Sequence, residues 1–557
     1  MAIERVIGID FGTSASVIKV KTYIDGKPVN DRVFTEYVLF DGSVTVPTLV
    51  FETGEGRFLC GHEVNSVAEK GVLYSNFKMD LISKEEQKRV KAEFLILKFF
   101  EYLYKTYCDQ KVFFNCKNIE AESNTSVNEC VVEKTYVSYP AKWPQNIREM
   151  MMEIAEKAGF KNVYGCDEPT AAIHTVMVQE VDRIQENRLL LPGQAAYILM
   201  IDMGAGTTDL ALCKYTLDGN TELEIPVTWP TADNETFLGG REIDYKLCDY
   251  MMNYLQSGGV PKMKSFASAQ NLRNIKTWKE AVVSPNLSRN QQAGEPGFLT
   301  LYKEMLPYDF PDFPTIGREN FEDLISDIII QFSKLVRQCI EEGQKLDKGF
   351  NGAEDIDFVI LTGGHSQWYF LHDILLGKPF FGEYERIYIP KVQAEPQRLI
   401  KLSKPQETVA LGLVYQPMNV DIKRCSSNSV WVQFEIDDYK STVEKVLDFG
   451  DVLPFFKDYT CKIDVKQSFF QTSNLLKCVK YCGRSMDTAI SSSTSRVVPK
   501  GVFTQVLDML FLPLTGTVDK KQFTIAFTVE VDTNQCAVIR GTVSGEGNTA
   551  NPVIFKF

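Results

Sequence analysis

The chain has 557 residues, of which 44% are hydrophobic and 24% are charged, a composition typical of a soluble globular protein with several compact units. This composition excludes a chain that is disordered or collagen-like throughout. Sixty Lys and Arg residues against 73 Asp and Glu residues give a net charge of −13, so nucleic acid is not expected as a primary partner.

The sequence also argues against secretion and against a membrane partner. Glu4 and Arg5 interrupt the apolar run that a signal peptide would need. The best apolar stretch, residues 189–201, is broken by Pro192 and Gly193, so no membrane-spanning segment is expected. The 13 cysteines include no Cys-x-x-Cys pair and are expected to be reduced. We therefore expect a cytoplasmic protein.

The first element in chain order is a strand that ends in a glycine turn. In IGIDFGTSAS (residues 7–16), Asp10 follows an apolar run, and Gly12, Thr13 and Ser14 form the turn. Glycine lets backbone amides approach an anion closely, and hydroxyls donate further hydrogen bonds. An aspartate at this place can bind Mg²⁺ directly or through water.

Helical periodicity follows. In residues 145–158, apolar side chains recur at helical spacing, and Gly159 stands where a C-terminal cap belongs. Alternation of strand-like and helical segments continues to about residue 420, the pattern of an α/β fold.

A second strand and glycine turn repeat the first. LMIDMGAGTTDLAL (residues 199–212) places Asp202 at the end of an apolar run. The turn that follows contains Gly204, Ala205, Gly206, Thr207 and Thr208. One such turn also occurs in ordinary hairpins. Two copies predict a pair of lobes that clamp a triphosphate between two hairpins, with one aspartate from each facing a metal ion.

Three further segments precede the change of pattern. Residues 285–314, rich in Gly, Pro, Asn and Asp, are expected to form a surface excursion. Residues 319–342 predict one amphipathic helix that ends before Gly343. FVILTGGHSQWYFL (residues 358–371) is a strand that ends in Gly363 and Gly364.

After residue 420 the hydrophobic period becomes two. Val430, Val432, Phe434 and Ile436 alternate with other side chains in one run, and residues 522–532 form another. Residues 491–496 (SSSTSR) predict a loop between strands. The segment 421–557 is therefore predicted to be an all-β module.

Taken together, these motifs resemble the actin, hexokinase and heat-shock ATPase superfamily and, within it, the seventy-kilodalton heat-shock chaperones. The two hairpins and the Gly-Gly turn match in order, as do residues 137–160, DEPTAAI (167–173), FLGGREID (237–244), Arg318 with Phe321 and Glu322, and ETVALGLVY (407–415). The resemblance covers residues 3–417. The β-module is similar to the family's peptide-binding domain mainly in pattern.

The resemblance implies an architecture. Residues 1–420 would form a two-lobed, actin-like ATPase of duplicated ribonuclease-H-like lobes, with lobe I at about 1–195 and 396–420 and lobe II at about 196–395. Residues 421–557 would form a β-sandwich that resembles a substrate-binding domain.

The resemblance also implies roles for single residues. Asp10 and Asp202 would hold a hydrated Mg²⁺ on the phosphates of ATP or ADP, and Lys78 would position the attacking water. Glu168, with Pro140, would sense the nucleotide. The hydroxyls and glycines of both turns would cradle the phosphates, and Gly239 and Gly240 would cap the γ-phosphate side. Nucleoside contacts would come from Lys279, Gly363, Gly364, His365 and Gln367. A simpler reading of Lys78 is a solvent-exposed lysine at a helix start, and a simpler reading of His365 is a satisfied loop histidine.

The sequence departs from the family pattern at several places. His365 and Gln367 stand where the family usually has Ser and an adenine-stacking Arg, and Gln cannot stack as a guanidinium does. Ala205 replaces a glycine of the second turn. PMNVDIKRC (residues 417–425) replaces the family's acidic-leucine linker, and with the β-module ending at Phe557 no helical lid is expected.

Three functions are compatible with these features. The first is a slow, chaperone-type ATPase whose nucleotide state adjusts a β-module that binds unfolded polypeptide or a protein client, assisted by co-chaperones. The second is an actin-like scaffold that assembles with nucleotide and does not cycle as a chaperone. The third is a small-molecule kinase, which the β-module makes least favoured.

Overall fold

The computed structural model describes most of residues 2–556 in two compact units. Outside the description lie residues 1, 30, 32, 67–69, 84, 115–130, 141, 142, 144, 181–183, 185–188, 190–193, 217–221, 231–237, 262–268, 314, 379, 381–386, 403, 418–420, 427, 428, 437, 438, 467–474, 484–502, 512–519, 533–536, 546–552 and 557. The first unit comprises Met1–Ala141, Met151–Thr221 and Thr228–Val420, and the second comprises Lys142–Met150, Glu222–Val227 and Asp421–Phe557. The predicted loop at 491–496 lies outside the described residues.

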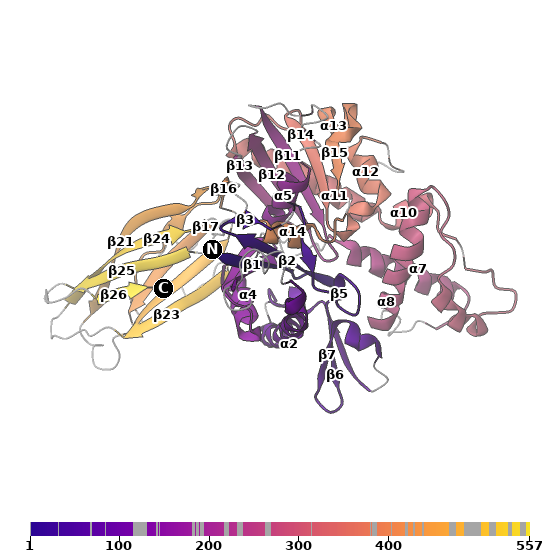
Figure 1. Ribbon diagram of the computed structural model, residues 1–557, viewed down its shortest axis with the longest axis horizontal. Coiled ribbons are helices and arrows are strands. Elements are labelled where there is room, and N and C mark those ends of the chain that lie inside the picture. The colour runs from indigo at the N-terminus through magenta and orange to yellow at the C-terminus, as the bar shows by residue number, and fades with distance from the viewer. Residues whose placement is uncertain are drawn as a thin grey trace. The chain divides into compact units, whose positions relative to one another are not determined.

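The first unit contains two sheets with one strand plan (Figure 1). In the first sheet the order is β10 (Val163–Asp167), β9 (Val131–Tyr139), β1 (Ile3–Asp10), β2 (Ala15–Ile24) and β3 (Lys27–Pro28), with β4 (Glu36–Tyr37) and β5 (Thr45–Pro47) also on β2. β1 is antiparallel to β2 and parallel to β9, which is parallel to β10.

The second sheet repeats this plan. Its corresponding strands are β15 (Leu399–Lys401), β14 (Ile356–Thr362), β11 (Ala195–Met203) and β12 (Thr208–Thr216). β11 is antiparallel to β12 and parallel to β14, which is parallel to β15. The duplication confirms the predicted α/β class and the actin-like pair of lobes. β15 belongs to the second sheet but lies after residue 395, which the sequence predicted as the end of lobe II. The exact lobe boundaries stay a prediction.

Two helices join the lobes, α5 (Glu168–Gln179) and α14 (Thr408–Val414). α5 contacts strands of both sheets, whereas α14 packs on the first sheet and on α5. Gly412 allows this approach, because a Cβ there would lie 1.6 Å from the carbonyl oxygen of Ala171. The Thr175 hydroxyl also donates to the carbonyl of Thr408 at 2.6 Å. The sequence of α14 therefore requires a glycine to place the two helices in backbone contact.

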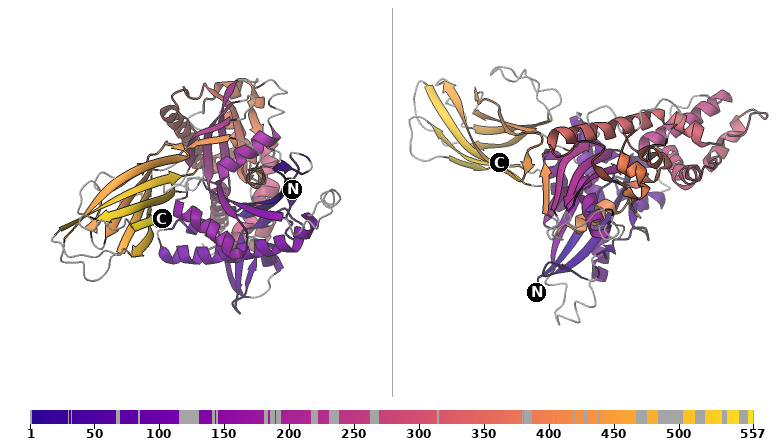
Figure 2. Two further views of the ribbon diagram at one scale, coloured as in Figure 1. Left: turned by 60° about the vertical axis from the view of Figure 1, so that its left-hand side comes forward. Right: turned by 90° about the horizontal axis from the view of Figure 1, so that it is seen from above.

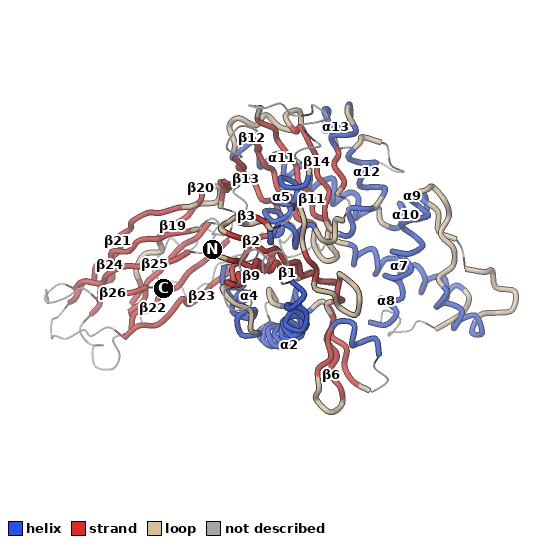
Figure 3. The backbone as a smooth tube through the Cα atoms, viewed as in Figure 1, coloured by secondary structure: helices blue, strands red, loops and turns tan. Residues whose placement is uncertain are grey.

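The remaining helices are α1 (Phe77–Asp80), α2 (Glu86–Gln110), α4 (Gln145–Ala158), α7 (Gly240–Ser257), α8 (Ala269–Trp278), α9 (Ser284–Ser288), α10 (Arg318–Leu324), α11 (Ser326–Leu346), α12 (Tyr369–Leu375) and α13 (Pro390–Ala394). Among them, α7, α8, α9 and α10 gather to one side of these sheets (Figure 3). A small sheet is formed by β7 (Phe58–Cys60), β6 (Leu49–Thr53) and β8 (Gly71–Ser75). No helix in the described part of the chain is long and apolar enough to cross a membrane.

The two helix predictions had different outcomes. The helix predicted at residues 145–158 is confirmed as α4, and Gly159 follows it with a φ of +119°. The single helix predicted for residues 319–342 is wrong, because the chain breaks at Ile325 between α10 and α11. α11 also continues past Gly343. A Cβ at Gly343 would lie 2.5 Å from the side chain of Leu212, so this glycine permits close packing and does not end the helix.

The second unit is a β-sandwich, as predicted (Figure 2). One sheet has the order β18 (Tyr439–Lys440), β17 (Ser429–Ile436), β22 (Leu475–Gly483), β23 (Phe503–Phe511), with β19 (Glu444–Leu447) on β17. The other has the order β21 (Phe455–Lys466), β24 (Lys520–Val531), β25 (Ala537–Gly545), β26 (Val553–Lys556). β16 (Asp421–Cys425) is parallel to β13 (Glu222–Pro230) and antiparallel to β20 (Val452–Leu453).

The alternating side chains of β17 and β24 form the core of this sandwich. Val430, Val432, Phe434 and Ile436 are buried in one cluster with the inward side chains of β24. Phe434 meets Phe527 edge to face, with ring centroids 4.9 Å apart. The period-two pattern therefore identified the buried face correctly.

This packing predicts the effect of truncating Phe434. Phe434→Ala should destabilise the β-unit by about 3–5 kcal/mol, because it removes a fully buried ring and leaves a cavity. Hydrogen exchange of amides in β17 and β24 would measure the loss. Phe456→Ala, at a position that is 69% exposed, is the control and should leave the exchange unchanged. Equal exchange in both variants would contradict the assigned core.

Candidate functional site

The turns that follow β1 and β11 meet at the centre of the first unit. Residues 11–14 connect β1 to β2, and residues 204–207 connect β11 to β12. A Cβ built on Gly206 would lie 2.9 Å from the hydroxyl oxygen of Thr13, so the two turns are in contact. The duplicated sheets thus bring the two glycine turns of the sequence together.

The first turn is fixed by neighbouring groups. The ring of Phe11 packs against Phe99 and Phe100 of α2, with centroids 5.9 and 5.2 Å away. The Thr48 hydroxyl donates to the carbonyl of Gly12 at 2.8 Å, and the Thr48 amide donates to the carbonyl of Ser14 at 3.0 Å. These contacts therefore fix the geometry of the first turn without a ligand.

Asp10 and Asp202 occupy equivalent places in the two lobes. Asp10 is the last residue of β1, and Asp202 is the second-last residue of β11. The Ser138 hydroxyl, from the neighbouring strand β9, donates to Asp10 Oδ1 at 2.8 Å. Asp202 is only 7% exposed and packs against Gly363, where a Cβ would lie 2.3 Å from Asp202 Oδ1.

Lys78 and Glu168 form a buried ion pair beside the aspartates. Lys78 lies on α1 and is 2% exposed, so the reading of an exposed lysine is wrong. Its Nζ lies 2.8 Å from Glu168 Oε1 and also donates to the carbonyl of Phe11. Glu168 is the first residue of α5, directly after Asp167, whose carboxylate caps that helix by accepting from the Thr170 amide at 3.0 Å. The ion pair thus connects the first turn to α5.

Electrostatics at this place favour an added cation. Burial and the charge of Glu168 raise the pKa of Asp10 to about 7, against the opposing effects of Lys78 and the Ser138 hydroxyl. Burial, followed by the charges of Glu168, Asp209 and Asp10, raises the pKa of Asp202 well above its ordinary value. Both pKa shifts therefore reflect burial first and, second, repulsion among carboxylates that the Lys78 ammonium offsets only in part.

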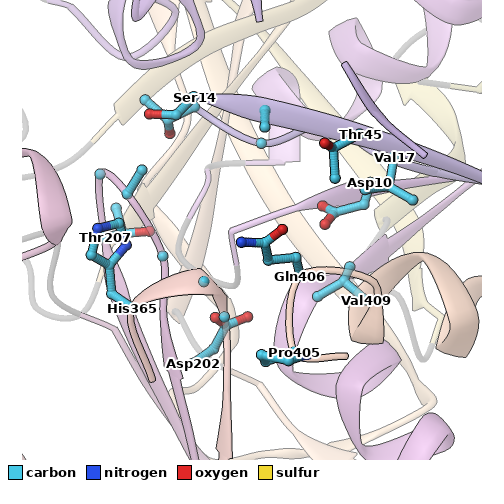
Figure 4. A pocket seen from close by; sticks show the side chains of 18 of the residues that line it. Asp10, Ser14, Val17, Thr45, Asp202, Thr207, His365, Pro405, Gln406 and Val409 are labelled. Carbon is cyan, nitrogen blue, oxygen red and sulfur yellow. The ribbon is translucent and has the colours of Figure 1, made fainter. Parts of the chain in front are cut away.

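These groups line one cleft of about 270 Å³ (Figure 4). Figure 4 shows Asp10 and Asp202 directed into the same space, with Gln406 between them in the view. Of the predicted site residues, the cleft brings together Asp10, Gly12, Thr13, Ser14, Lys78, Glu168, Asp202, Gly204, Ala205, Gly206, Thr207, Gly363, Gly364 and His365.

Other predicted residues lie outside the lining of this cleft. The Thr208 hydroxyl is buried and donates to the carbonyl of Leu238 at 2.6 Å. The Gly240 amide donates to the carbonyl of Gly204 at 3.1 Å, and a Cβ on Gly239 would lie 2.6 Å from the carbonyl oxygen of Ala205. Thr208, Gly239 and Gly240 therefore support the second turn but do not line the cleft.

Lys279 and Gln367 line an adjoining pocket of about 190 Å³, which shares Gly364, His365 and two further residues with the cleft. Lys279 begins a π-helical turn (Lys279–Val283) between α8 and α9, and its ammonium is 2.6 Å from Asp244 Oδ1. Gln367 is exposed. Both therefore stand at the edge of the main cleft.

Sequence reasoning missed several cleft residues. Lys276, Glu280, Thr45 and Gln406 line the cleft, and Ser138 orients Asp10. Lys276 precedes Lys279 by one helical turn, and the basic periodicity of residues 276–279 could have suggested it. Nothing in the sequence singles out Ser138, because its role depends on the pairing of β9 with β1.

The donor set fits a hydrated magnesium ion. Asp10 and Asp202 face one space, while Glu168 in the same cleft is paired with Lys78, and among the described residues no group of three or more His, Cys, Asp and Glu side chains could hold a metal ion. Mg²⁺ keeps several of its waters and is usually held by one or two carboxylates with substrate phosphates. The site is therefore suited to an ion that a polyphosphate brings with it.

Comparisons with known proteins agree with this geometry. Residues 110–376 match the family model described as Hsp70 protein. The chain is 24% identical over 377 residues to a protein named Chaperone protein DnaK from Picrophilus torridus, covering 65% of this chain and 52% of that protein. It is also 24% identical over 426 residues to Chaperone protein DnaK from Thermoplasma volcanium, covering 74% of this chain and 58% of that protein.

The coverage of these matches is partial. The chain spans about half the length of the curated relatives it matches. The family model begins at residue 110, so the first glycine turn and Lys78 precede it. The contact between Gly206 and Thr13 places the first turn against the second independently of the match, and Lys78 lines the same cleft.

The position of Gly363 gives a test of the site geometry. Gly363 has φ +81° and ψ 153°, a backbone region that is essentially restricted to glycine. Gly363→Ala should lower the free energy of unfolding by about 1–3 kcal/mol, because it combines this strain with a clash against Asp202. Urea unfolding would measure the change.

The matched control for this substitution is the next residue. Gly364→Ala should cost little, since its Cβ would meet only Gln406 at an ordinary contact distance of 3.5 Å. If both variants unfolded at the same urea concentration, the packing of Gly363 on Asp202 would be incorrect.

Proposed function

Because this chain is a divergent member of the Hsp70 family, we propose that it binds Mg²⁺–ATP in the cleft between its two lobes and hydrolyses it slowly to ADP and phosphate. The observation that carries the proposal is the arrangement of Asp10, Asp202 and the Lys78–Glu168 ion pair between two glycine turns. Phosphoryl transfer to water depends mainly on positioning and on charge stabilisation, and this cleft offers groups for both.

Each part of the cleft has a task in this proposal. Asp10 and Asp202 would hold the hydrated Mg²⁺, which would neutralise charge on the phosphate chain. Thr13, Ser14 and Thr207 would donate hydrogen bonds to phosphate oxygens together with the amides of their turns. Lys78 would hold the attacking water near the terminal phosphate. The buried pair with Glu168 fixes the Lys78 ammonium for this task.

The same ion pair offers a route from nucleotide to conformation. Glu168 begins α5, and α5 packs against α14 through Gly412. A change at Lys78 on hydrolysis would act on Glu168 and through it on the two helices that join the lobes. We propose that this pair of helices reports the nucleotide state.

We further propose that the β-unit binds extended polypeptide at its sheet edges. β21 and β26 are the edge strands of one sheet. Each exposes an apolar side chain, with Phe456 69% and Ile554 79% exposed. An exposed edge with apolar side chains suits the addition of a peptide strand. The clients would be unfolded polypeptides, and co-chaperones would assist the cycle in the cytoplasm.

Lys78→Ala tests the catalytic proposal. Single-turnover hydrolysis of ATP should fall by about 100-fold or more, because the variant loses the cation that positions the water. Binding of ATP, measured by titration calorimetry, should change only slightly. Lys88→Ala removes an exposed lysine near this helix and should leave hydrolysis unchanged. Hydrolysis at the wild-type rate in Lys78→Ala would remove Lys78 from the mechanism.

Peptide binding tests the role of the β-unit. A fluorescent unfolded peptide should bind the full chain with different affinities in ATP and in ADP, as measured by anisotropy. Phe456→Ser and Ile554→Ser should weaken binding about threefold to tenfold, since each removes one apolar contact of about 1 kcal/mol. Val72→Ser, at an exposed position of the first unit, is the control.

Two results would contradict this role. Peptide affinity that does not depend on nucleotide would argue against coupling of the β-unit to hydrolysis. ATP-dependent light scattering or pelleting of the purified chain would instead favour an actin-like assembly protein, the alternative function of the same fold.

A further inference from the structure

A second cavity lies in the first unit, away from the glycine turns. It has a volume of about 370 Å³, within the range of about 300–1,000 Å³ that is typical of ligand pockets. Its walls come from α7 and from the segment between α9 and α10, which includes most of the surface excursion expected at residues 285–314. Figure 3 shows these helices to one side of the two sheets. Among the described residues, none lines both this cavity and the cleft, so the proposed function gives the cavity no task.

Aromatic rings form one wall of this cavity. The ring of Tyr254, on α7, meets Phe310 with centroids 5.2 Å apart and Phe313 with centroids 4.8 Å apart. The Tyr254 hydroxyl donates to the carbonyl of Asp312 at 2.7 Å and so holds the segment of Phe310 against the helix. Tyr308 also lines the cavity, and its side chain is exposed. The cavity is therefore held in shape by contacts within the chain and is open to solvent at Tyr308.

The backbone around the cavity offers few hydrogen bonds to a ligand. Pro307 and Pro311 line the cavity and have no N–H group. The carbonyl of Pro307 accepts the Phe310 amide at 2.9 Å, and the carbonyl of Lys303 accepts the Leu306 amide at 3.2 Å. A peptide that adds as a β-strand needs a row of free backbone groups and does not suit this wall. A polyproline II segment has no internal hydrogen bonds and docks on aromatic-lined grooves, so it matches the wall better.

Acidic side chains accompany the aromatic wall. Glu295, Glu304 and Asp312 line the cavity together with one ammonium, that of Lys303. The Lys303 Nζ atom lies 3.3 Å from Glu295 Oε2 and 3.7 Å from Asp312 Oδ1. Glu304 is exposed, and the side chain of Asp312 is almost fully exposed. One cation therefore leaves an excess of negative charge, which favours a ligand that carries a positive charge.

We propose that this cavity binds a proline-rich peptide segment that carries arginine or lysine, presented by a partner protein. The prolines pack on the rings of Tyr308 and Phe310, and the cation pairs with the carboxylates of Glu304 and Asp312. Lys303 competes with the cation of the segment for these carboxylates and so weakens its binding. The inference goes beyond the proposed function, because this partner is distinct from the nucleotide and from the unfolded polypeptide assigned to the β-unit.

Fluorescence anisotropy of the full chain with labelled peptides tests the proposal. The first peptide alternates proline with leucine and ends in two arginines, and the second ends in two glutamates instead. The arginine peptide should bind about tenfold more tightly, and added salt should weaken its binding because salt screens exposed charges. A third peptide keeps the arginines but has alanine in place of proline. It should bind several times more weakly, because its backbone is no longer set in the polyproline II conformation.

Substitutions at exposed positions locate the binding site. Tyr308→Ala removes an exposed ring and should weaken binding of the arginine peptide about tenfold. Tyr388→Ala, at an exposed position outside the cavity, is the matched control and should leave the affinity unchanged. Lys303→Ala removes the competing ammonium and should tighten binding about threefold. Lys345→Ala removes an exposed lysine of α11 and should have no effect.

Four outcomes would overturn the inference. Equal affinity for the arginine and glutamate peptides, or no tighter binding by Lys303→Ala, would refute the match of charge. Equal affinity for the alanine peptide would refute the preference for proline. Unchanged affinity in Tyr308→Ala would place the peptide elsewhere on the chain. A wild-type chain that sediments as a dimer, with Tyr308→Ala as a monomer, would make a second copy of this chain the occupant.

The test is independent of the earlier proposals. It needs no nucleotide, so its result stands whether or not the cleft binds ATP. Proline has no N–H group and cannot extend a sheet edge, so the arginine peptide is a poor ligand for the β-unit. Phe456→Ser should accordingly leave its affinity unchanged, and a loss in that variant would move the site to the β-unit and refute the assignment to the cavity.

Discussion

The structure depends on an imbalance of buried charge. Asp10, Asp202 and Glu168 face one cleft, and Lys78 is the ammonium that pairs with Glu168 there. Burying carboxylates without full compensation is costly, and the raised pKa values of both aspartates record this cost. A cleft with this charge deficit gains stability from a cation, and a polyphosphate that carries Mg²⁺ brings the cation together with groups that the glycine turns can bind. The charge imbalance therefore connects the fold to the proposed chemistry.

The imbalance persists because backbone contacts hold the acidic groups in place. Gly363 packs against Asp202, and Gly206 packs against Thr13. At the joint between the lobes, Gly412 brings α14 onto the backbone of α5, the helix that starts with Glu168. Side chains at these three positions would push the lobes or the turns apart. The glycines thus position the carboxylates, and the helix that begins with Glu168 is the one on which α14 packs.

The sequence predicted the features that short segments determine. Strand, aspartate and glycine turn are contiguous, so the two hairpins and the period-two strands of the β-sandwich could be identified from pattern alone. Features that depend on contacts between distant segments could not. Ser138 reaches Asp10 only because β9 pairs with β1, and the glycine at residue 343, within α11, leaves room for Leu212 of β12. The sequence pattern also could not predict in which direction a single side chain points. The Thr208 hydroxyl, for example, is directed away from the cleft and donates to the carbonyl of Leu238.

Lys279 makes different contacts from those that its match to the family implied. Its position in the sequence suggested a direct contact with the nucleoside, but the π-helical turn at Lys279–Val283 and the pair with Asp244 hold its ammonium behind His365. The Lys279 ammonium therefore contacts His365 and Asp244 and does not line the main cleft. Under the proposed function, the glycine turns and the buried carboxylates of that cleft would select a polyphosphate that carries a metal ion. The imidazole fits at residue 365 only because Gly240 leaves space for the ring, since a Cβ on Gly240 would lie 1.5 Å from His365 Nε2.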